Sequence, residues 1–285
     1  MSKLTNNKTP NPNNPSALKP RYEIRRLGPE HLSWAAAIVS HSNGFYSPVW
    51  PNLYPEDVGG RVKGIFEAAN YLCLHQINSG MSFGVFDTEY EYKTEEAKKL
   101  GGKLYWDTKE PGIEKEKGRE AEGERLLAQM DFPLVSIALS YDAFNHLDMT
   151  KLEPMLALLP HYGLTFHILG SRDQRDPASW EPTGPGQVLF RNATSTRHDY
   201  EGEGIMGAMA RWLMREAAQK GYRGIQIECL ADAVTHVWST AEDPFKGSVI
   251  SEFECETWTD EDGKLAFAPA KQRITKCYVD LQPKA

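Results

Sequence analysis

Hydrophobic and polar positions along the chain fall into blocks whose period switches between that of helices and that of strands. Apolar residues recur every three or four positions over 29–44 and from Glu56 to Gln76, which predicts two helices. Short runs rich in β-branched and aromatic residues predict strands at 22–27, 81–92, 132–144, 187–198 and 223–230. Helices that interleave with strands in this way are typical of an α/β or α+β fold with a mixed sheet.

The last third of the chain continues the alternation of helices and strands and then ends in two predicted strands. A helix is predicted from Ile205 to Lys220, because Gly221 directly follows its last turn. A shorter helix follows at 231–241. Polar and apolar positions alternate at 248–258 and again at 271–281, which predicts a terminal hairpin with a long connection.

The pattern of residues 151–171 is less regular, so its elements are predicted from the positions of proline and glycine as well. We expect a short helix at 151–164, ended by Pro160 and Gly163, and then a strand at 165–171. A long loop is expected to follow, and the aromatic, proline-rich stretch from Phe45 to Tyr54 is also expected to be a loop.

Two segments contain few hydrophobic side chains that a core could bury. Residues 1–20 are polar and rich in Pro and Asn, which favours a disordered tail. Residues 92–130 are rich in Lys, Glu and Gly, which favours a solvated, partly helical insertion. We therefore expect one domain over 21–285 that carries this insertion.

Composition narrows the possible functions. The 285 residues are 40% hydrophobic and 25% charged, and the net charge is −7. An acidic chain without a basic run is a poor binder of nucleic acid and of anionic membranes, since both require concentrated Lys and Arg. No apolar run approaches the ~18 residues of a membrane span, and the first residues do not resemble a signal peptide, so a cytoplasmic protein is expected.

The sequence also argues against metal and hydrolase chemistry. The four cysteines form no CxxC pair, and the eight histidines form no HxxxH or HExxH pattern, so no metal site is expected. No GxSxG motif is present to supply a nucleophilic serine.

The segment from Thr194 to Cys229 has the outline of a phosphate-binding turn that leads into a helix. Glycines let the backbone approach a ligand, and the free N–H groups at the helix start point toward an anion. Glycines before a helix are by themselves a weak signal, because a simple connection between a strand and a helix has the same pattern.

The extended pattern is more specific. Asp199-Tyr200 precede the turn, Gly202 and Gly204 lie in it, Ile205 follows it, and Gly221 leads into the next strand. This segment resembles the acetyl-CoA-binding segment of the GCN5-related N-acetyltransferase superfamily, and the upstream order of elements is similar as well. The resemblance implies a central mixed, largely antiparallel sheet, opened into a V between strands 187–197 and 223–230.

The resemblance also implies a binding site for acetyl-CoA as the acyl donor. In that family the pantetheine arm lies between the two splayed strands, and the pyrophosphate rests on the amides of the turn. By position, the arm would lie along Thr194, Ser195 and Thr196. The pyrophosphate would contact Gly202, Glu203, Gly204, Ile205, Met206 and Gly207.

This turn departs from the family pattern by carrying Glu201 and Glu203 where basic or neutral residues are usual. A carboxylate about 5 Å from a phosphate oxygen costs roughly 3 kcal/mol at an effective dielectric near 20. Carboxylates at a helix N-terminus also favour the helix itself, so the turn can be satisfied internally instead of by a ligand. Arg197 or Arg211 can offset the repulsion, and we expect weaker, more salt-sensitive binding than with a basic turn.

The proton-transfer groups are harder to place. The tyrosine that often protonates the leaving thiolate in this family has no counterpart in 231–241, where Trp238 or Thr240 falls. Glu228, His236 and His198 are the candidate acids and bases. Each also has an ordinary alternative as a packed or solvent-facing side chain. The aromatic stretch from Phe45 to Tyr54 is a candidate wall of the acceptor pocket, or a simple hydrophobic anchor.

Two functions fit these observations. The first is transfer of an acetyl or other acyl group from CoA to the amine of a small molecule or a peptide. The second is a catalytically degenerate relative that serves as an acyl-CoA-binding or interaction module. The sequence leaves the oligomeric state open.

Overall fold

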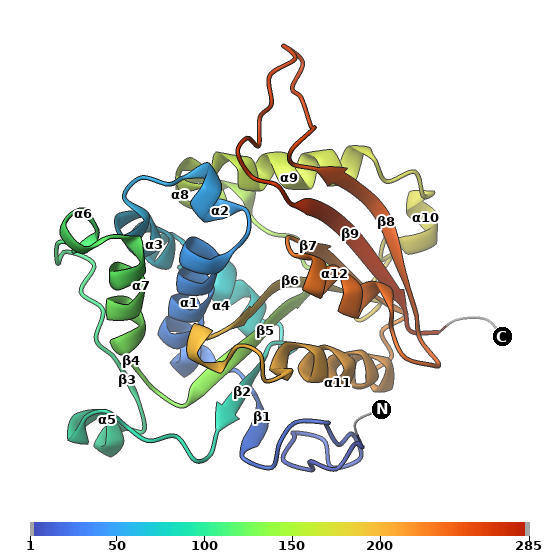
Figure 1. Ribbon diagram of the computed structural model, residues 1–285. Helices are drawn as coiled ribbons and strands as arrows, with labels where there is room; N and C mark the ends of the chain where they lie inside the picture. Colours follow the sequence, from blue (N-terminus) through green and yellow to red (C-terminus); the bar gives the residue numbers. More distant parts are fainter. Residues whose placement is uncertain (1–2, 283–285) are drawn as a thin grey trace.

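The computed structural model describes residues 3–282 and is built on one twisted sheet of seven strands (Figure 1). In spatial order the strands are β1 (Tyr22–Arg26), β2 (Phe83–Asp87), β5 (Leu134–Asp142), β6 (Val188–Thr196), β7 (Gly224–Cys229), β9 (Arg273–Asp280) and β8 (Lys246–Glu254). All neighbouring pairs are antiparallel except β6 and β7. The mixed, largely antiparallel sheet is therefore confirmed.

Helices cover both faces of the sheet. One face is covered by α1 (Leu32–His41), α3 (Val58–Ala68) and α4 (Asn70–Asn78). The other is covered by α11 (Ile205–Gln219) and α12 (Asp232–Ser239). The first face is packed closely because Ala35, Ala36 and Ala37 are fully buried and let α1 approach the strands. On the second face Trp212 is fully buried and meets the ring of Phe83 edge-on at 4.8 Å.

The remaining elements are short. Between α1 and α3 lie η2 (Ser42–Tyr46), a π-helical turn, and α2 (Trp50–Leu53), and the chain also forms η1 (Pro29–His31), η3 (Met149–Leu152), η4 (His198–Tyr200) and α10 (Pro177–Trp180). The expected loop over 45–54 thus contains helical turns, and the expected helix over 56–76 is two helices that meet at Ala69.

The strand predicted at 165–171 is wrong. These residues belong to α9 (Pro160–Ser171), which follows α8 (Glu153–Leu158) after a single residue. Pro160 is the first residue of α9, where its missing N–H costs nothing and its fixed φ suits a helix. Pro160 therefore begins the second helix, whereas the sequence pattern predicts that it ends the first.

The segment expected to be a solvated insertion is partly helical and partly packed. It contains α5 (Glu95–Leu100), α6 (Glu114–Lys117), α7 (Arg119–Ala128) and a two-stranded sheet of β3 (Lys103–Leu104) and β4 (Met130–Asp131). Leu126 and Met130 are fully buried, and Glu122 is buried with Arg125 at 2.7 Å. Residues 92–130 thus add a small apolar layer beside α1 and α3.

Residues 3–20 differ from the expected disordered tail. They run along α11, where Asn14 is buried and its Nδ2 donates to the Trp212 carbonyl and to Glu216. The Trp212 indole donates to the Asn14 carbonyl at 2.9 Å, and Arg215 donates to the Asn14 side chain at 2.9 Å. Backbone bonds between Asn6 and Ser16 fold the segment back on itself.

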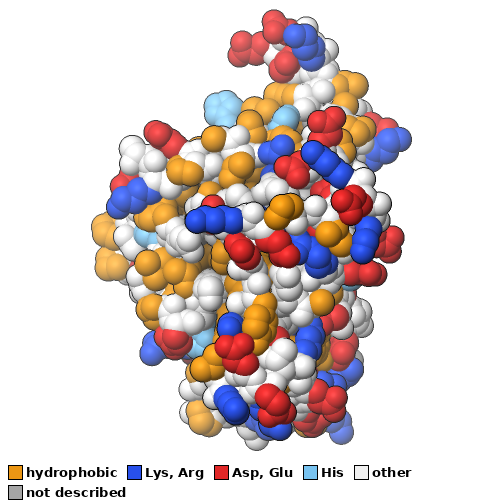
Figure 2. Space-filling view, turned by 90° about the vertical axis from the view of Figure 1, so that its left-hand side faces the viewer, with side chains coloured by type: hydrophobic (Ala, Val, Ile, Leu, Met, Phe, Trp, Pro, Cys, Tyr) orange, Lys and Arg blue, Asp and Glu red, His pale blue; other side chains and the backbone are white. Residues whose placement is uncertain are grey.

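The predicted terminal hairpin of β8 and β9 is confirmed, with a connection over 255–272 that projects from the sheet. Its tip carries charged side chains at the top of Figure 2. On the face shown there, basic side chains are mixed with acidic and hydrophobic ones instead of gathering in one area. Over residues 3–282, none of the helices combines the length and apolar character that a membrane crossing requires.

We predict that Asn14→Ala lowers the free energy of unfolding by about 1–3 kcal/mol, because it leaves buried partners on α11 without their hydrogen bonds. Urea unfolding followed by far-UV circular dichroism measures the change. Asn13→Ala is the matched control, since that side chain is exposed one residue earlier. Equal unfolding midpoints for the two variants would contradict the packing of residues 3–20 on α11.

Candidate active site

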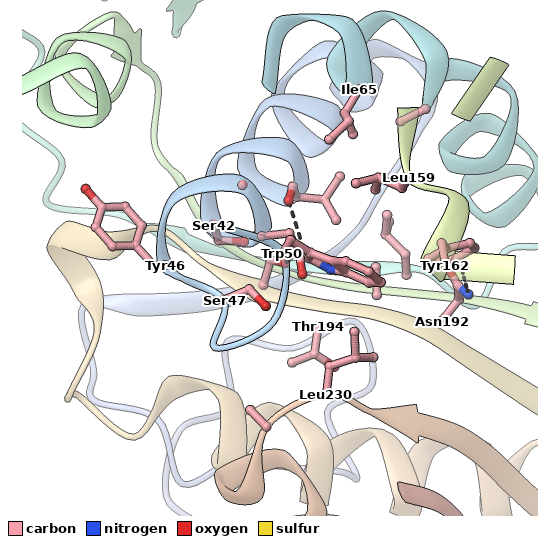
Figure 3. A pocket seen from close by; sticks show the side chains of 18 of the residues that line it. Ser42, Tyr46, Ser47, Trp50, Ile65, Leu159, Tyr162, Asn192, Thr194 and Leu230 are labelled. Carbon is pink, nitrogen blue, oxygen red and sulfur yellow. Dashed lines mark hydrogen bonds between the residues drawn. The ribbon is translucent and has the colours of Figure 1, made fainter. Parts of the chain in front are cut away.

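A cavity of about 280 Å³ lies between the helices of one face and the middle of the sheet (Figure 3). Its wall is mainly apolar and aromatic and is formed by Trp50, Tyr54, Ile65, Leu159, Tyr162 and Leu230 among others. In Figure 3, Ile65 and Leu159 lie on one side of Trp50, while Thr194 and Leu230 lie on the opposite side. Five residues of the 45–54 stretch line it, and three of them, Tyr46, Trp50 and Tyr54, are aromatic.

The cavity opens into a gap between β6 and β7. The two strands pair only over 188–191 and 224–227. Beyond that point β6 continues beside β5 to Thr196, while β7 diverges from it. Residues 192–196 on one side of the gap, and 227, 228, 230 and 231 on the other, line the cavity. The predicted V-shaped opening is therefore present.

One extra residue marks the start of this divergence. Ser140 of β5 lies opposite Arg191, and Leu139 lies opposite Ala193, so Asn192 has no partner in the register. Such a bulge bends a strand and re-aims its side chains. Asn192 donates to the Tyr162 hydroxyl at 3.0 Å and lines the cavity, where Figure 3 shows the pair.

Arg191 is a buried cation beside this bulge. It is 2% exposed, and its Nη1 donates to the Leu139 carbonyl at 2.6 Å. Its Nη2 donates to Oγ1 of Thr194 at 2.7 Å, and among the described residues no carboxylate pairs with it. Burial lowers the pKa of Arg191 to about 9, so it keeps its charge at neutral pH. Because Thr194 accepts this bond, its own O–H remains free to donate into the cavity.

The turn of residues 201–204 leads into α11 beside the cavity. Gly202 and Gly204 have φ of 78° and 74°, a left-handed conformation that other residues adopt at a cost. Within the described chain, the backbone N–H groups of 202–207 have no protein acceptor outside the helix. Ile205 is buried in the core and fixes the start of α11. Six consecutive backbone N–H groups without a protein acceptor thus lie before and at the start of a 15-residue helix, where an anion is electrostatically favoured.

The two carboxylates of the turn have different surroundings. Oε2 of Glu203 accepts bonds from Lys19 Nζ at 2.7 Å and from the Tyr22 hydroxyl at 2.8 Å. These hydrogen bonds lower the pKa of Glu203, and its charge is offset by Lys19. Glu201 lines the cavity and has His198 as its partner at 3.1 Å. The electrostatic objection to an anion on this turn is thus reduced for Glu203 and remains for Glu201.

Two arginines are candidates to offset the charge of Glu201 and Glu203, and one of them, Arg197, is already paired with Asp199. It is buried, makes two bonds to Asp199 at 3.1 and 2.7 Å, and also donates to the Phe132 carbonyl. Arg211 lies nearer the turn, since a Cβ on Gly207 would be 3.8 Å from its Nη1. Arg211 pairs with Glu242 at the surface, at 2.7 Å.

Only one of the three candidate acids and bases lines the cavity. Glu228 does, and burial raises its pKa, an effect that Lys276 and a bond from Gln226 partly offset. His236 is exposed on α12. His198 stacks on Tyr46 with ring centroids 3.7 Å apart and lies at the surface.

Several lining residues had no signal in the sequence. Tyr162 lies on α9 and Leu159 directly before it, both within the helix predicted over 151–164, whose pattern does not indicate which side chains face the cavity. Arg61 lies on the polar side of an ordinary helical pattern, and Asn192 is polar within a strand. Over residues 3–282, no group of three or more His, Cys, Asp or Glu side chains is placed to hold a metal ion.

Comparison with known proteins shows similarity in structure alone. No protein-family model matches the chain, and no match is found among curated protein sequences. The C-terminal condensation domain of Ebony, solved in complex with β-alanyl-dopamine, superposes with a TM-score of 0.59 at 19% identity, covering 92% of this chain and 98% of that one. Arylalkylamine N-acetyltransferase 2 from Aedes aegypti superposes at 0.55 and 9% identity, covering 92% and 99%. An agmatine N-acetyltransferase superposes at 0.51 and 10% identity, covering 91% and 99%.

These superpositions cover almost the whole of each protein, so the similarity concerns the complete architecture. The chain therefore has the fold of the GCN5-related N-acetyltransferases, in a divergent form. The fold inferred from the turn and the element order is confirmed.

We predict that Glu228→Gln stabilises the protein relative to wild type as the pH rises. The folded-state pKa of Glu228 lies above its ordinary value of 4.5, so ionisation costs the folded state stability as pH rises through that window. Thermal unfolding at pH 5 and pH 8 measures this, with Glu254→Gln on the exposed side of β8 as control. A difference between variant and wild type that is the same at both pH values would contradict it.

Proposed function

We propose that this protein transfers an acyl group from acyl-CoA, with acetyl-CoA as the simplest donor, to the amine of a small molecule. The observation that carries the proposal is the continuity of three features. The unpaired edge of β6 over 192–196 lines the cavity, and Glu201, which also lines it, directly precedes the free amides of 202–207.

The donor fits these features by its chemistry. A pyrophosphate is an anion that six free backbone amides can bind. A pantetheine arm carries two amides, and the edge of β6 that β7 leaves unpaired offers matching backbone groups, in the manner of an added strand. Thr194, Ser195 and Thr196 would lie along the arm. Gly202, Glu203, Gly204, Ile205, Met206 and Gly207 would hold the pyrophosphate mainly through their backbone.

The reaction requires a neutral amine at the thioester carbonyl, where the C–N bond forms and the C–S bond breaks. Glu228 lies in the cavity, and its raised pKa makes it a stronger proton acceptor for the amine than an ordinary exposed carboxylate. His198 and His236 remain alternative bases only through a chain of water, because neither lines the cavity.

Thr194 offers a replacement for the tyrosine that the family often uses. Its hydroxyl accepts from the Arg191 guanidinium at 2.7 Å, so its proton points to another acceptor. A hydroxyl polarised by a buried cation donates more strongly to a developing negative charge. We assign Thr194 to the oxygen or sulfur that gains charge, and Arg191 to positioning and polarising Thr194.

The cavity favours a small amine over a peptide, because it is partly enclosed and lined by rings. Trp50 and Tyr162 offer aromatic faces to a cation or a ring, and Glu201 and Glu228 offer carboxylates. The amine acceptors named for the superposed structures are consistent with this class.

We predict that acetyl-CoA binds the native protein and that Gly204→Trp abolishes binding. A large side chain at φ 74° strains the turn and covers the amides. Isothermal calorimetry measures binding, and a free-thiol assay over a panel of amines measures turnover.

Gly263→Trp is the matched control, since Gly263 has φ 78° and open space around it in the distant β8–β9 connection. Turnover that survives Gly204→Trp would place the chemistry elsewhere. Donor binding without turnover on any amine would favour the acyl-CoA-binding module instead.

We predict that Thr194→Val lowers kcat by about ten- to a hundredfold, the effect of losing one charge-assisted hydrogen bond in the transition state. Thr194→Ser keeps the hydroxyl and should retain most of the activity. The KM for the donor should change less than kcat in both variants. A Thr194→Val enzyme with unchanged kcat would exclude this role.

A further inference from the structure

Arg61 is a cation in the wall of a cavity that is otherwise mostly apolar. It lies on α3, and its Nη1 donates to the carbonyl of Leu158 at 2.6 Å. Its guanidinium carbon stands 4.5 Å from the centre of the Tyr54 ring, and its Nε is buried without a hydrogen-bond partner. No carboxylate of the described chain lies within ion-pair distance of it.

These contacts leave the charge of Arg61 incompletely compensated. A guanidinium has five N–H donors, and the protein takes one of them here. A buried or half-buried charge is normally paired, because its desolvation otherwise costs free energy. Arginine is also the side chain whose planar fork matches a carboxylate in two parallel bonds. Among the described residues, Arg61 therefore has a positive charge that no carboxylate of the protein offsets.

Arg61 lies at the end of the cavity away from the reacting groups. Its partner Leu158 precedes Leu159, and Ile65 lies one helical turn after Arg61 on the same face of α3. In Figure 3, Leu159 and Ile65 lie across the cavity from Thr194 and Leu230, which border the gap between β6 and β7. The carboxylates that line the cavity, those of Glu228 and Glu201, belong to β7 and to the turn that follows β6, the two strands that border the gap.

We propose that the acceptor carries a carboxylate at the end remote from its amine, with an apolar or aromatic spacer between them. The amine would meet the gap and Glu228, the spacer would contact Trp50 and Tyr162, and the carboxylate would bind Arg61. An α-amino acid does not fit, because its amine and carboxylate are adjacent while the two charged ends of the cavity lie on opposite sides. This inference rests on the proposed function and names its substrate class.

A matched pair of amines tests the inference. We choose 4-(2-aminoethyl)benzoate and 2-phenylethylamine, which differ only in the distal carboxylate. Wild type should use the carboxylated amine with a kcat/KM about ten- to a hundredfold higher, the range expected for hydrogen bonds to a charged group. Arg61→Gln keeps one N–H for the Leu158 carbonyl and should remove this preference, mainly through KM. Arg61→Lys keeps the charge without the fork and should retain part of it.

Arg172→Met is the control, because Arg172 also donates one guanidinium N–H to one backbone carbonyl, that of Glu252, outside the cavity. It should leave the preference unchanged. Thermal unfolding establishes that each variant is folded. A wild type that prefers 2-phenylethylamine, or a preference that persists in a folded Arg61→Gln, would overturn the inference.

Calorimetry separates this inference from the proposed function. If acetyl-CoA binds but neither amine is turned over, the proposed transfer fails while the acceptor site can still be measured. Tighter binding of 4-(2-aminoethyl)benzoate than of 2-phenylethylamine to wild type, lost in Arg61→Gln, then supports the carboxylate site. Equal affinity, or binding of neither amine, overturns it.

Discussion

The separation of β6 from β7 is the constraint on which the site depends. A sheet normally pairs every inner strand on both edges, since unpaired backbone groups are costly when buried. Here the unpartnered Asn192 bends β6 away after Arg191, and the edge that β7 abandons becomes the wall of a cavity. The same bend brings the Arg191 guanidinium to Thr194. A defect in sheet pairing thus creates both the space and the polarised hydroxyl inside it.

The turn was accessible to sequence reasoning because its residues act through the backbone, whereas the gap between β6 and β7 was expected from the family resemblance. Gly202 and Gly204 are required by left-handed φ values, and a helix start follows at Ile205 wherever the chain turns this way. The strands were predicted because their buried faces need β-branched and apolar residues in short runs. These features are local, so the sequence around them contains the information.

Other features depend on residues far apart in the chain. The local sequence makes Glu203 unfavourable for an anion site, but Lys19 and Tyr22, more than 180 positions earlier in the chain, donate hydrogen bonds to its carboxylate. The polar composition of residues 3–20 indicated disorder, whereas Asn14 is ordered by partners on α11. Arg61 and Tyr162 reach the cavity from different helices, and no local pattern records that convergence.

The contacts of Asn14 with α11 also bear on how the chain is made. Asn14 and the Trp212 carbonyl are 198 residues apart, so during synthesis Asn14 leaves the ribosome before α11 and waits for its partners. At synthesis rates of about 5–20 residues per second the delay is roughly 10–40 s. During that time Leu18 and Tyr22, which end up in the core, have no α11 to cover them. A polar, proline-rich composition keeps such a segment solvated until α11 is made. This accounts for the sequence of residues 3–20 without requiring disorder in the folded protein.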